Sequence, residues 1–337
     1  MTDTTDGSTI RNNYDQTDRP AETEQRDGSD TLRYRTLIEY DVKNRVKAFK
    51  EATGTDTYKT GYTYDADNRV TKVQYNGSDT TKIEYTYDPL NRITARTLTN
   101  STACTSQYSY VQGAAAYGTS ATTPLIESIT QGSGTNALNY SYPYDNRGNI
   151  TSETRNNVTI TYEYDALGQL TRVNDPGDPT AGSDGTTWIY TYDLGGNMLS
   201  KTAYAHTTET PTGTGNTTTH TCDSAWKENL TANGTYPLTY DDIGNLKTYA
   251  GWTYTWEAGR LLTKQVQNST VVEYDYNGNG LRTKKTVSNN TSGYVYATYN
   301  YTYNGKTLTH LTKNSDSMRF FYDAQGRPAM VDYNGTK

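Results

Sequence analysis

The sequence predicts an all-β fold in which repeated β-hairpins pair side by side into one continuous, spiralling sheet. Three observations lead to this prediction: one short phrase recurs along most of the 337 residues, aromatic and polar residues alternate before each copy, and tyrosine is abundant. A repeat of about twenty residues is typical of proteins that stack one small supersecondary unit.

The recurring phrase is an aromatic residue, an acidic residue or asparagine, a few variable positions, and then glycine or asparagine. Four pairs of neighbouring copies begin 20 to 24 residues apart, and longer gaps separate others. The copy at Trp256 is one residue shorter than the others, and Asn277 replaces aspartate in the next copy. The defining positions of the ten copies are Tyr40, Asp41, Asn44; Tyr64, Asp65, Asn68; Tyr87, Asp88, Asn91; Tyr144, Asp145, Gly148; Tyr164, Asp165, Gly168; Tyr192, Asp193, Gly196; Tyr240, Asp241, Gly244; Trp256, Glu257, Gly259; Tyr276, Asn277, Gly280; and Tyr322, Asp323, Gly326.

Each phrase is predicted to be the turn of a hairpin. Aromatic residues on alternate positions precede it, as in residues 62–64 and 190–192, and this is the period of a strand. Aspartate caps its own turn, and glycine and asparagine enter the left-handed backbone region at least cost. The phrase therefore predicts a type I turn closed by a bulge, followed by a second strand such as residues 69–73.

Composition limits how these hairpins are stabilised. Leucine, isoleucine, valine and phenylalanine make up only about one residue in eight, a proportion typical of disordered chains. The 33 tyrosines change that interpretation, because each buries on the order of 150–250 Å² while its hydroxyl stays hydrogen-bonded. Isolated hairpins are marginally stable and open sheet edges aggregate, so we expect the sheet to curl into a spiral, shell or barrel.

The period also suggests how the chain is organised. Residues 31–337 are predicted to be a single repeat domain, and residues 1–30 a loose lead-in or a decayed repeat around Tyr14. Residues 119–136 and 207–221 are rich in threonine and glycine and interrupt the period, so they are predicted to be long loops.

Charge and apolar patterning argue against two classes of partner. A formal net charge of −6 provides no basic excess to neutralise phosphates, which predicts no nucleic-acid partner. The sequence has no apolar run of the length of a membrane span, and its polar N-terminal segment lacks the pattern of a signal peptide. Cys104 and Cys222 show no spacing pattern, so two unpaired thiols and a disulfide between them are the alternatives.

The residues predict no enzyme, metal site or cofactor site. An aspartate that recurs at the same point of every hairpin is explained by the turn, whereas catalysis needs one constellation that differs from the rest. Residues 275–280 match the first half of a calcium loop, but Thr286 stands where its last ligand should be a glutamate. Residues 132–137 imitate a dinucleotide loop, but strand-like alternation follows where a helix is required.

The phrases at residues 64–71 and 164–171 resemble the Rhs or YD-repeat family. That family includes bacterial Rhs and wall-associated proteins, the cage component of insecticidal toxin complexes, and the animal teneurins. The resemblance extends over about residues 30–335. It implies a hollow shell around a toxic or reactive C-terminal polypeptide that this chain lacks, and an extracellular or cell-surface location. We therefore expect the chain to be a fragment of a secreted parent protein.

Two functions follow as hypotheses. The first is a non-enzymatic segment of shell wall, whose partner is the C-terminal toxin or effector of the parent protein. The alternative is an adhesive module that binds carbohydrate at a cell surface through aromatic stacking. Its candidate stacking residues are Trp188, Trp226, Trp252 and Trp256.

Overall fold

The structure is a computed structural model that describes residues 9–336 except 54–55, 78–79, 101, 114–121, 179–181, 183, 227 and 324. The described residues form one continuous sheet of 28 antiparallel strands. They also include a short 3₁₀ helix, η2 (Gly134–Asn136). The predicted all-β fold of repeated hairpins is confirmed.

The strands follow one another along the chain with short connections. They are β1 (Thr9–Tyr14), β2 (Pro20–Arg26), β3 (Leu32–Tyr40), β4 (Val46–Thr53), β5 (Asp56–Tyr64), β6 (Val70–Tyr75), β7 (Thr81–Tyr87), β8 (Ile93–Asn100), β9 (Thr102–Gln112), β10 (Thr122–Gln131), β11 (Leu138–Ser141), β12 (Ser152–Arg155), β13 (Val158–Tyr164), β14 (Leu170–Asp175), β15 (Thr186–Tyr192), β16 (Met198–Ala205), β17 (Asn216–Cys222), β18 (Leu230–Asn233), β19 (Tyr236–Tyr240), β20 (Leu246–Tyr249), β21 (Trp252–Glu257), β22 (Leu261–Gln267), β23 (Thr270–Tyr276), β24 (Arg282–Asn289), β25 (Val295–Asn304), β26 (Thr307–Lys313), β27 (Asp316–Tyr322) and β28 (Pro328–Tyr333).

The strands belong to two compact units. Unit 1 comprises Met1–Cys104 together with Tyr254–Lys337, and unit 2 comprises Thr105–Thr253. A boundary at residue 30, between a lead-in and a single repeat domain, stays a prediction. Strands β1 and β2 lie before that position and pair with each other.

A bulge fixes the register of the hairpins. In the β3–β4 pair the register shifts between Glu39 and Tyr40, directly before the turn. The same shift precedes the repeat tyrosine in the β5–β6, β7–β8, β13–β14, β15–β16, β19–β20, β23–β24 and β27–β28 pairs. Because a bulge adds one unpaired residue to one strand, it increases the local twist at the same point of each repeat.

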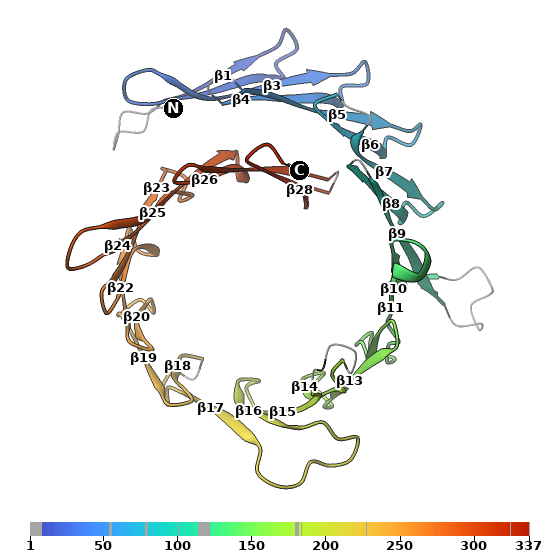
Figure 1. Ribbon diagram of the computed structural model, residues 1–337, viewed down its shortest axis with the longest axis vertical. Helices are drawn as coiled ribbons and strands as arrows, with labels where there is room; N and C mark the ends of the chain where they lie inside the picture. The colour runs from blue at the N-terminus through green and yellow to red at the C-terminus, as the bar shows by residue number, and fades with distance from the viewer. Residues whose placement is uncertain are drawn as a thin grey trace. The chain divides into compact units, whose positions relative to one another are not determined.

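Unit 1 contains two layers of strands that are distant in the sequence (Figure 1). Val73, Tyr75, Ile83 and Tyr85 from β6 and β7 form one buried cluster with Phe321 from β27. The rings of Tyr75 and Phe321 meet edge to face with centroids 4.7 Å apart, and the Tyr75 hydroxyl donates to the Tyr322 carbonyl at 2.7 Å. The apolar core of unit 1 therefore lies where β6 and β7 pack against β27.

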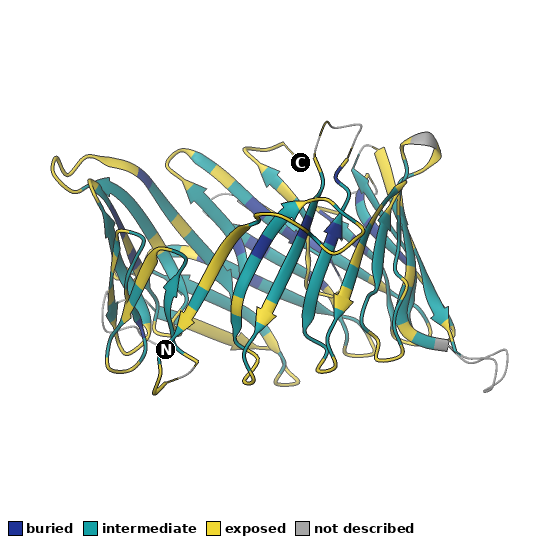
Figure 2. Ribbon diagram, turned by 90° about the horizontal axis from the view of Figure 1, so that it is seen from below, coloured by how far each residue is buried: buried dark blue, intermediate teal, exposed yellow. Residues whose placement is uncertain are grey.

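Unit 2 is built differently. Its buried side chains, among the described residues, are the polar Asn174, Thr187, Thr202 and Asn245. Fully buried residues are few along the strands in general, as the colouring in Figure 2 shows. Unit 2 is consequently held together by hydrogen bonds and half-buried side chains instead of an apolar core.

The first predicted loop is wrong over most of its described length, whereas the second is correct for residues 207–215 and wrong only from Asn216 on. Within residues 119–136, Thr122–Gln131 is strand β10, which pairs with β9; residues 119–121 lie outside the described part of the chain. Within residues 207–221, the segment from Asn216 belongs to β17, which pairs with β16. Threonine explains the strand part of each segment, because its branched side chain favours strands even where the local composition resembles a loop.

Candidate functional site

The aspartate of the repeat organises the turn through both its side chain and its backbone. The Asp65 Oδ1 atom accepts hydrogen bonds from the backbone N–H of Asp67 at 3.0 Å and of Arg69 at 2.9 Å. The Asp65 N–H donates to the Arg69 carbonyl at 3.0 Å, and the Asn68 N–H donates to the Asp65 carbonyl at 3.3 Å. The carboxylate is therefore committed to the backbone of its own turn.

The fourth or fifth position of the phrase adopts the left-handed conformation. Its φ angle is 65° at Asn68 and 80° at Gly168, in the region that glycine and asparagine enter at the least energetic cost. The Trp256 copy differs, because Ala258 and Gly259 both have positive φ there. Positive φ also occurs at Asn44, Asn91, Gly148, Gly196, Gly244, Gly280 and Gly326.

The repeat tyrosine connects its hairpin to the one before it. The Tyr64 hydroxyl donates to the Val46 carbonyl at 2.8 Å, and the Tyr87 hydroxyl donates to the Val70 carbonyl at 2.7 Å. Burial raises the pKa of the Tyr64 hydroxyl, which keeps it protonated and able to donate. The same backward hydrogen bond is made by Tyr40, Tyr144, Tyr164, Tyr192, Tyr240, Tyr276 and Tyr322.

In the N-terminal copies an arginine extends the turn to the following repeat. Arg45 Nε donates to Asp41 Oδ2 at 2.7 Å, and Arg45 Nη1 donates to Asn68 Oδ1 at 2.9 Å. The guanidinium carbon lies 4.3 Å from the centroid of the Tyr64 ring, within the range of cation–π attraction. We call this set of contacts the arginine bridge.

Two further arginine bridges flank the first. Arg19 reaches Asn44 Oδ1 at 2.6 Å and lies 4.3 Å from the Tyr40 ring centroid. Arg69 reaches Asn91 Oδ1 at 2.9 Å and lies 5.0 Å from the ring centroid of the next repeat tyrosine. The first repeats of unit 1 are thus joined by ionic and amide groups as well as by their strands.

Three of the four copies in unit 2 carry asparagine where the N-terminal copies carry arginine, and the Tyr164 copy carries Gln169. Asn149 Nδ2 donates to Asp145 Oδ2 at 2.9 Å, and Asn197 Nδ2 donates to Asp193 Oδ2 at 2.9 Å. These hydrogen bonds hold the pKa of Asp145 and of Asp193 below their usual value. The shorter asparagine side chain bonds only to the aspartate of its own turn. It therefore keeps the aspartate contact of an arginine bridge and lacks the contacts with the following repeat.

A buried ion pair joins the two layers of unit 1. Arg319 Nη2 in β27 lies 2.8 Å from Glu51 Oε2 in β4, and the two side chains are only 5% and 7% exposed. Glu51 Oε1 also accepts a hydrogen bond from the Tyr34 hydroxyl at 2.5 Å. The Arg319 guanidinium carbon lies 3.3 Å from the centroid of the Tyr58 ring. Burial lowers the pKa of Arg319, and the carboxylate of Glu51 opposes that shift.

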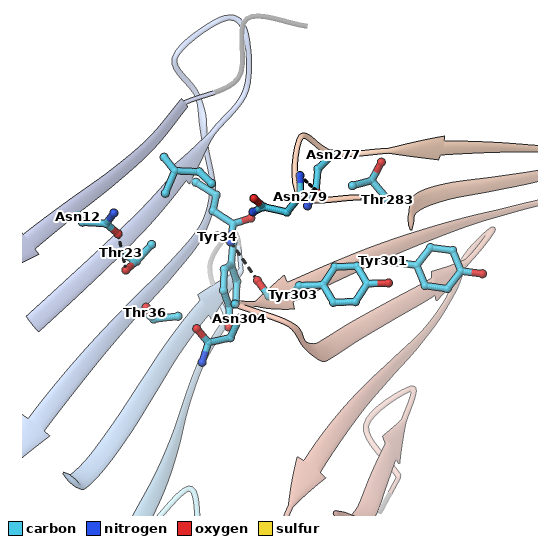
Figure 3. A pocket seen from close by; sticks show the side chains of 13 residues that line it. Asn12, Thr23, Tyr34, Thr36, Asn277, Asn279, Thr283, Tyr301, Tyr303 and Asn304 are labelled. Carbon is cyan, nitrogen blue, oxygen red and sulfur yellow. Dashed lines mark hydrogen bonds between the residues drawn. The ribbon is translucent and has the colours of Figure 1, made fainter. Parts of the chain in front are cut away.

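A cavity of about 310 Å³ lies in the same unit, between β1–β3 and the hairpins formed by β23–β24 and β25–β26 (Figure 3). Its walls carry carboxamides, hydroxyls and tyrosine rings, including Asn12, Gln25, Tyr34, Tyr301 and Asn304. The Gln25 Nε2 atom donates to the Tyr303 carbonyl at 3.0 Å, which ties the two sides of the cavity together.

The tryptophans predicted to stack on sugars lie in separate surroundings. The Lys201 ammonium lies 3.9 Å from the ring centroid of Trp188. Trp226 is 54% exposed and lies beside the Gly244 turn. Trp252 and Trp256 are half-buried in β21. None of the four is among the described residues that line the cavity, and their role in glycan binding stays a prediction.

The calcium-like segment and the two cysteines have structural explanations. In the calcium-like segment, Asn277 Oδ1 accepts from the N–H groups of Asn279 and Leu281, each at 3.0 Å, as in the other repeat turns. Cys104 and Cys222 carry free thiols. Across the described residues, no group of three or more histidine, cysteine or acidic side chains is arranged to hold a metal ion. That same part of the chain has no helix with the length and apolarity to cross a membrane.

Hairpins with this turn, each joined to the previous one by a tyrosine hydroxyl, define a YD-repeat protein. The profile of the Teneurin YD-shell family matches residues 1–121 and 120–227, so the chain belongs to that family. The resemblance noted in the sequence is therefore confirmed.

Two curated relatives align with different fractions of the chain's length. It is 29% identical over 164 residues to the tRNA3(Ser)-specific nuclease WapA of Bacillus spizizenii, a match that covers 42% of this chain and 7% of that protein. It is 27% identical over 193 residues to Teneurin-4 of Mus musculus, covering 54% of this chain and 6% of the relative. The chain thus spans less than a tenth of the curated relatives it matches.

A solved structure shows the same fold. The crystal structure of TcdB2-TccC3-Cdc42 aligns with 98% of this chain and 21% of that chain, with a TM-score of 0.52 and 16% sequence identity. This similarity identifies the architecture of the chain as that of a YD shell.

Proposed function

We propose that this chain is a non-enzymatic segment of a YD-repeat shell that encloses or presents a C-terminal polypeptide, such as a toxin or another effector. The observation that carries the proposal is that the side chains of the repeat are committed to holding one hairpin against the next. The turn carboxylates accept from backbone N–H groups, and the repeat tyrosines donate to backbone carbonyls.

The packing of unit 1 supports the same role. Strands β6 and β7 pack against β27 around Tyr75 and Phe321, as successive turns of a spiralling sheet would. The ion pair of Glu51 and Arg319 joins those layers at a point where an apolar contact alone would leave the register free. A wall built in this way resists sliding of one layer over the other.

The size of the matched relatives supports a partner outside this chain. WapA is named as a nuclease, and the matched stretch is 7% of it. A structural segment of this kind therefore leaves the chemistry to another part of the parent protein. We place the parent protein outside the cell or at its surface, in line with the family resemblance.

Cryo-electron microscopy of the purified parent protein, combined with limited proteolysis, tests the proposal. We expect the repeats to form a curved wall around density for the C-terminal polypeptide, and that polypeptide to resist a protease which digests it when it is expressed alone. A solid sandwich, or equal digestion of the polypeptide with and without the repeats, would rule out enclosure.

One observation favours the alternative, a carbohydrate-binding adhesive module: among the four candidate tryptophans, Trp226 is 54% exposed. An exposed indole ring has a free face on which a sugar could stack. Loss of binding to cell-wall glycans in a Trp226→Ala variant, with unchanged stability, is the result that this alternative requires.

A further inference from the structure

We propose that the cavity of unit 1 is a binding site for an uncharged sugar of one or two rings. This proposal goes beyond the role in a shell wall, and it does not depend on that role. The proposed site is also separate from the four tryptophans, because none of them is among the described residues that line the cavity.

The lining of the cavity is uncharged, although 20% of the residues of the chain are charged. Asparagine and glutamine carboxamides, threonine hydroxyls and tyrosine rings make up most of its walls. Enclosing an ionic ligand without an opposite charge costs several kcal/mol, so these walls disfavour phosphates, carboxylates and cations. A neutral ligand rich in hydroxyl groups fits this chemistry.

Several polar groups of the cavity have no partner within the described part of the chain. The Tyr301 hydroxyl, the Thr283 hydroxyl and the Asn304 carboxamide make no side-chain hydrogen bond to the described residues. A carboxamide both donates and accepts, as a hydroxyl does. Because each hydroxyl of a sugar also donates and accepts, these groups match a sugar better than a ligand that only accepts.

Part of the same wall is already fixed in place. The Tyr34 ring is 1% exposed, and its hydroxyl is held by Glu51 at 2.5 Å. The Gln25 Nε2 atom is held by the Tyr303 carbonyl, which leaves the Gln25 Oε1 atom as an acceptor. A preformed wall lowers the entropy lost when a ligand binds.

The arrangement of these groups suits a ring-shaped ligand. Figure 3 shows Tyr301 and Tyr303 of β25 on one side, Asn12, Thr23 and Thr36 on the other, and Asn304 between them. The volume of about 310 Å³ is at the small end of known ligand sites. Tyrosine rings offer an apolar face for the C–H groups of a sugar, while the opposite side offers hydrogen bonds.

Titration calorimetry of the 337-residue chain against matched sugars tests the proposal. The neutral probes are glucose, galactose, N-acetylglucosamine and their disaccharides, and the charged probes are glucose 6-phosphate and glucuronate. We expect at least one neutral sugar to bind in the millimolar range, and its charged counterpart to bind about tenfold more weakly or not at all. Absence of binding by every neutral probe, or equal binding of the charged ones, would overturn the proposal.

Paired variants on one strand locate the site. The double variant Tyr301→Phe/Asn304→Ala removes two unused polar groups and is expected to weaken binding about tenfold or more. Its control is Tyr299→Phe/Asn300→Ala, which changes the same residue types on β25 outside the cavity lining and should leave affinity unchanged. Circular dichroism and melting temperature establish that both variants fold.

A third variant separates the cavity from the tryptophans. Trp226→Ala should bind the same sugar with the affinity of the unchanged chain, because Trp226 is outside the described lining. If Trp226→Ala abolishes binding while Tyr301→Phe/Asn304→Ala retains it, the cavity is not the site. We expect neither variant to change the proteolytic protection of a C-terminal polypeptide, so failure of the sugar proposal can be told apart from failure of the shell proposal.

Discussion

Unit 1 and unit 2 use the same hairpin but stabilise it in different ways. Unit 1 buries Val73, Tyr75, Ile83 and Phe321 between two layers, and its first repeats are linked by arginine bridges. The buried side chains of unit 2, within the described chain, are polar, and three of its four repeat turns are closed by asparagine. The repeat sequence thus specifies the hairpin, while the second layer decides whether a hairpin gains an apolar core.

The largest expected effect is that of Arg319→Ala. Removing the guanidinium leaves the buried Glu51 carboxylate without its ionic partner, which should cost about 3–5 kcal/mol of the free energy of unfolding. Hydrogen exchange should show lost protection in the strands of unit 1 and unchanged protection in unit 2.

The double variant Glu51→Ala/Arg319→Ala is the control for this first prediction. It removes both charges and should destabilise less than the sum of the two single variants. Equal loss of protection in both units would instead mean that they unfold as one cooperative block, and the contrast between them would fail.

Truncation of an isoleucine in each unit tests the apolar core directly. Ile83 is 0% exposed, so Ile83→Ala should cost about 2–5 kcal/mol through the cavity it leaves. Ile160 in β13 of unit 2 is only half-buried, so Ile160→Ala should cost clearly less. Chemical denaturation of the two variants compares them, and similar losses would show that unit 2 has a core of comparable strength.

A substitution in the turn tests the hairpin that both units share. Gly168 has a φ of 80° and no atom within 4 Å of the position of an added Cβ, so the cost of Gly168→Val arises from the backbone alone. We expect a loss of about 1–3 kcal/mol, seen as a lower melting temperature.

Gly168→Asn is the matched control for this turn. It introduces the residue that unit 1 uses at Asn44 and Asn68, and it should therefore be tolerated better than valine. If the valine variant were as stable as the parent chain, backbone strain would not be what selects the residue at this position.

The variant Arg45→Asn converts a turn of unit 1 into the type found in unit 2. It should keep the hydrogen bond to Asp41 and lose the contacts with Asn68 and the Tyr64 ring, at a cost of about 0.5–1.5 kcal/mol. Part of this effect is ionic, so it should shrink in high salt.

Asn149→Ala in unit 2 is the comparison for the arginine variant. It removes a neutral hydrogen bond within one turn, so its effect should be nearly independent of salt. Denaturation curves at low and high salt measure both variants, and the same salt dependence in each would contradict an ionic link between repeats.

The smallest effect is on acid stability. The hydrogen bond from Asn149 lowers the pKa of Asp145 in the folded state, so its contribution is fully present above the unfolded value of 3.8. That contribution is lost as the pH falls through the lower folded pKa. The melting temperature should therefore decline below about pH 4, and Asp145→Asn should make the decline less steep. An unchanged acid profile in that variant would exclude this carboxylate as a contributor.

What the sequence predicts well is local. The aspartate and the glycine or asparagine of each turn act within a few residues of each other, so the hairpins could be derived from spacing alone. The arginine bridges also have a sequence signal, because Arg45 lies one repeat before Asn68 and Arg69 lies one repeat before Asn91. When the repeats are aligned with one another, each bridging arginine precedes its asparagine partner by one repeat.

The second layer has no such signal. Glu51 and Arg319 are 268 positions apart, and neither belongs to the repeated phrase. Their pairing depends on which strands of unit 1 pack face to face, which no periodicity within one repeat encodes. The cavity is hidden for the same reason, because its walls come from β1–β3 and from hairpins near the other end of the chain.

Because each repeat tyrosine bonds to the hairpin before it, the order of synthesis affects the order in which the repeats are completed. A ribosome releases the N-terminal hairpins first, and each of them exposes a carbonyl, such as that of Val46 or Val70, until the next tyrosine arrives. Each new repeat thus completes its predecessor, and folding trails synthesis by one hairpin. The two layers of unit 1 need a later step, because Glu51 must wait for Arg319, which lies in β27, the next-to-last strand of the chain.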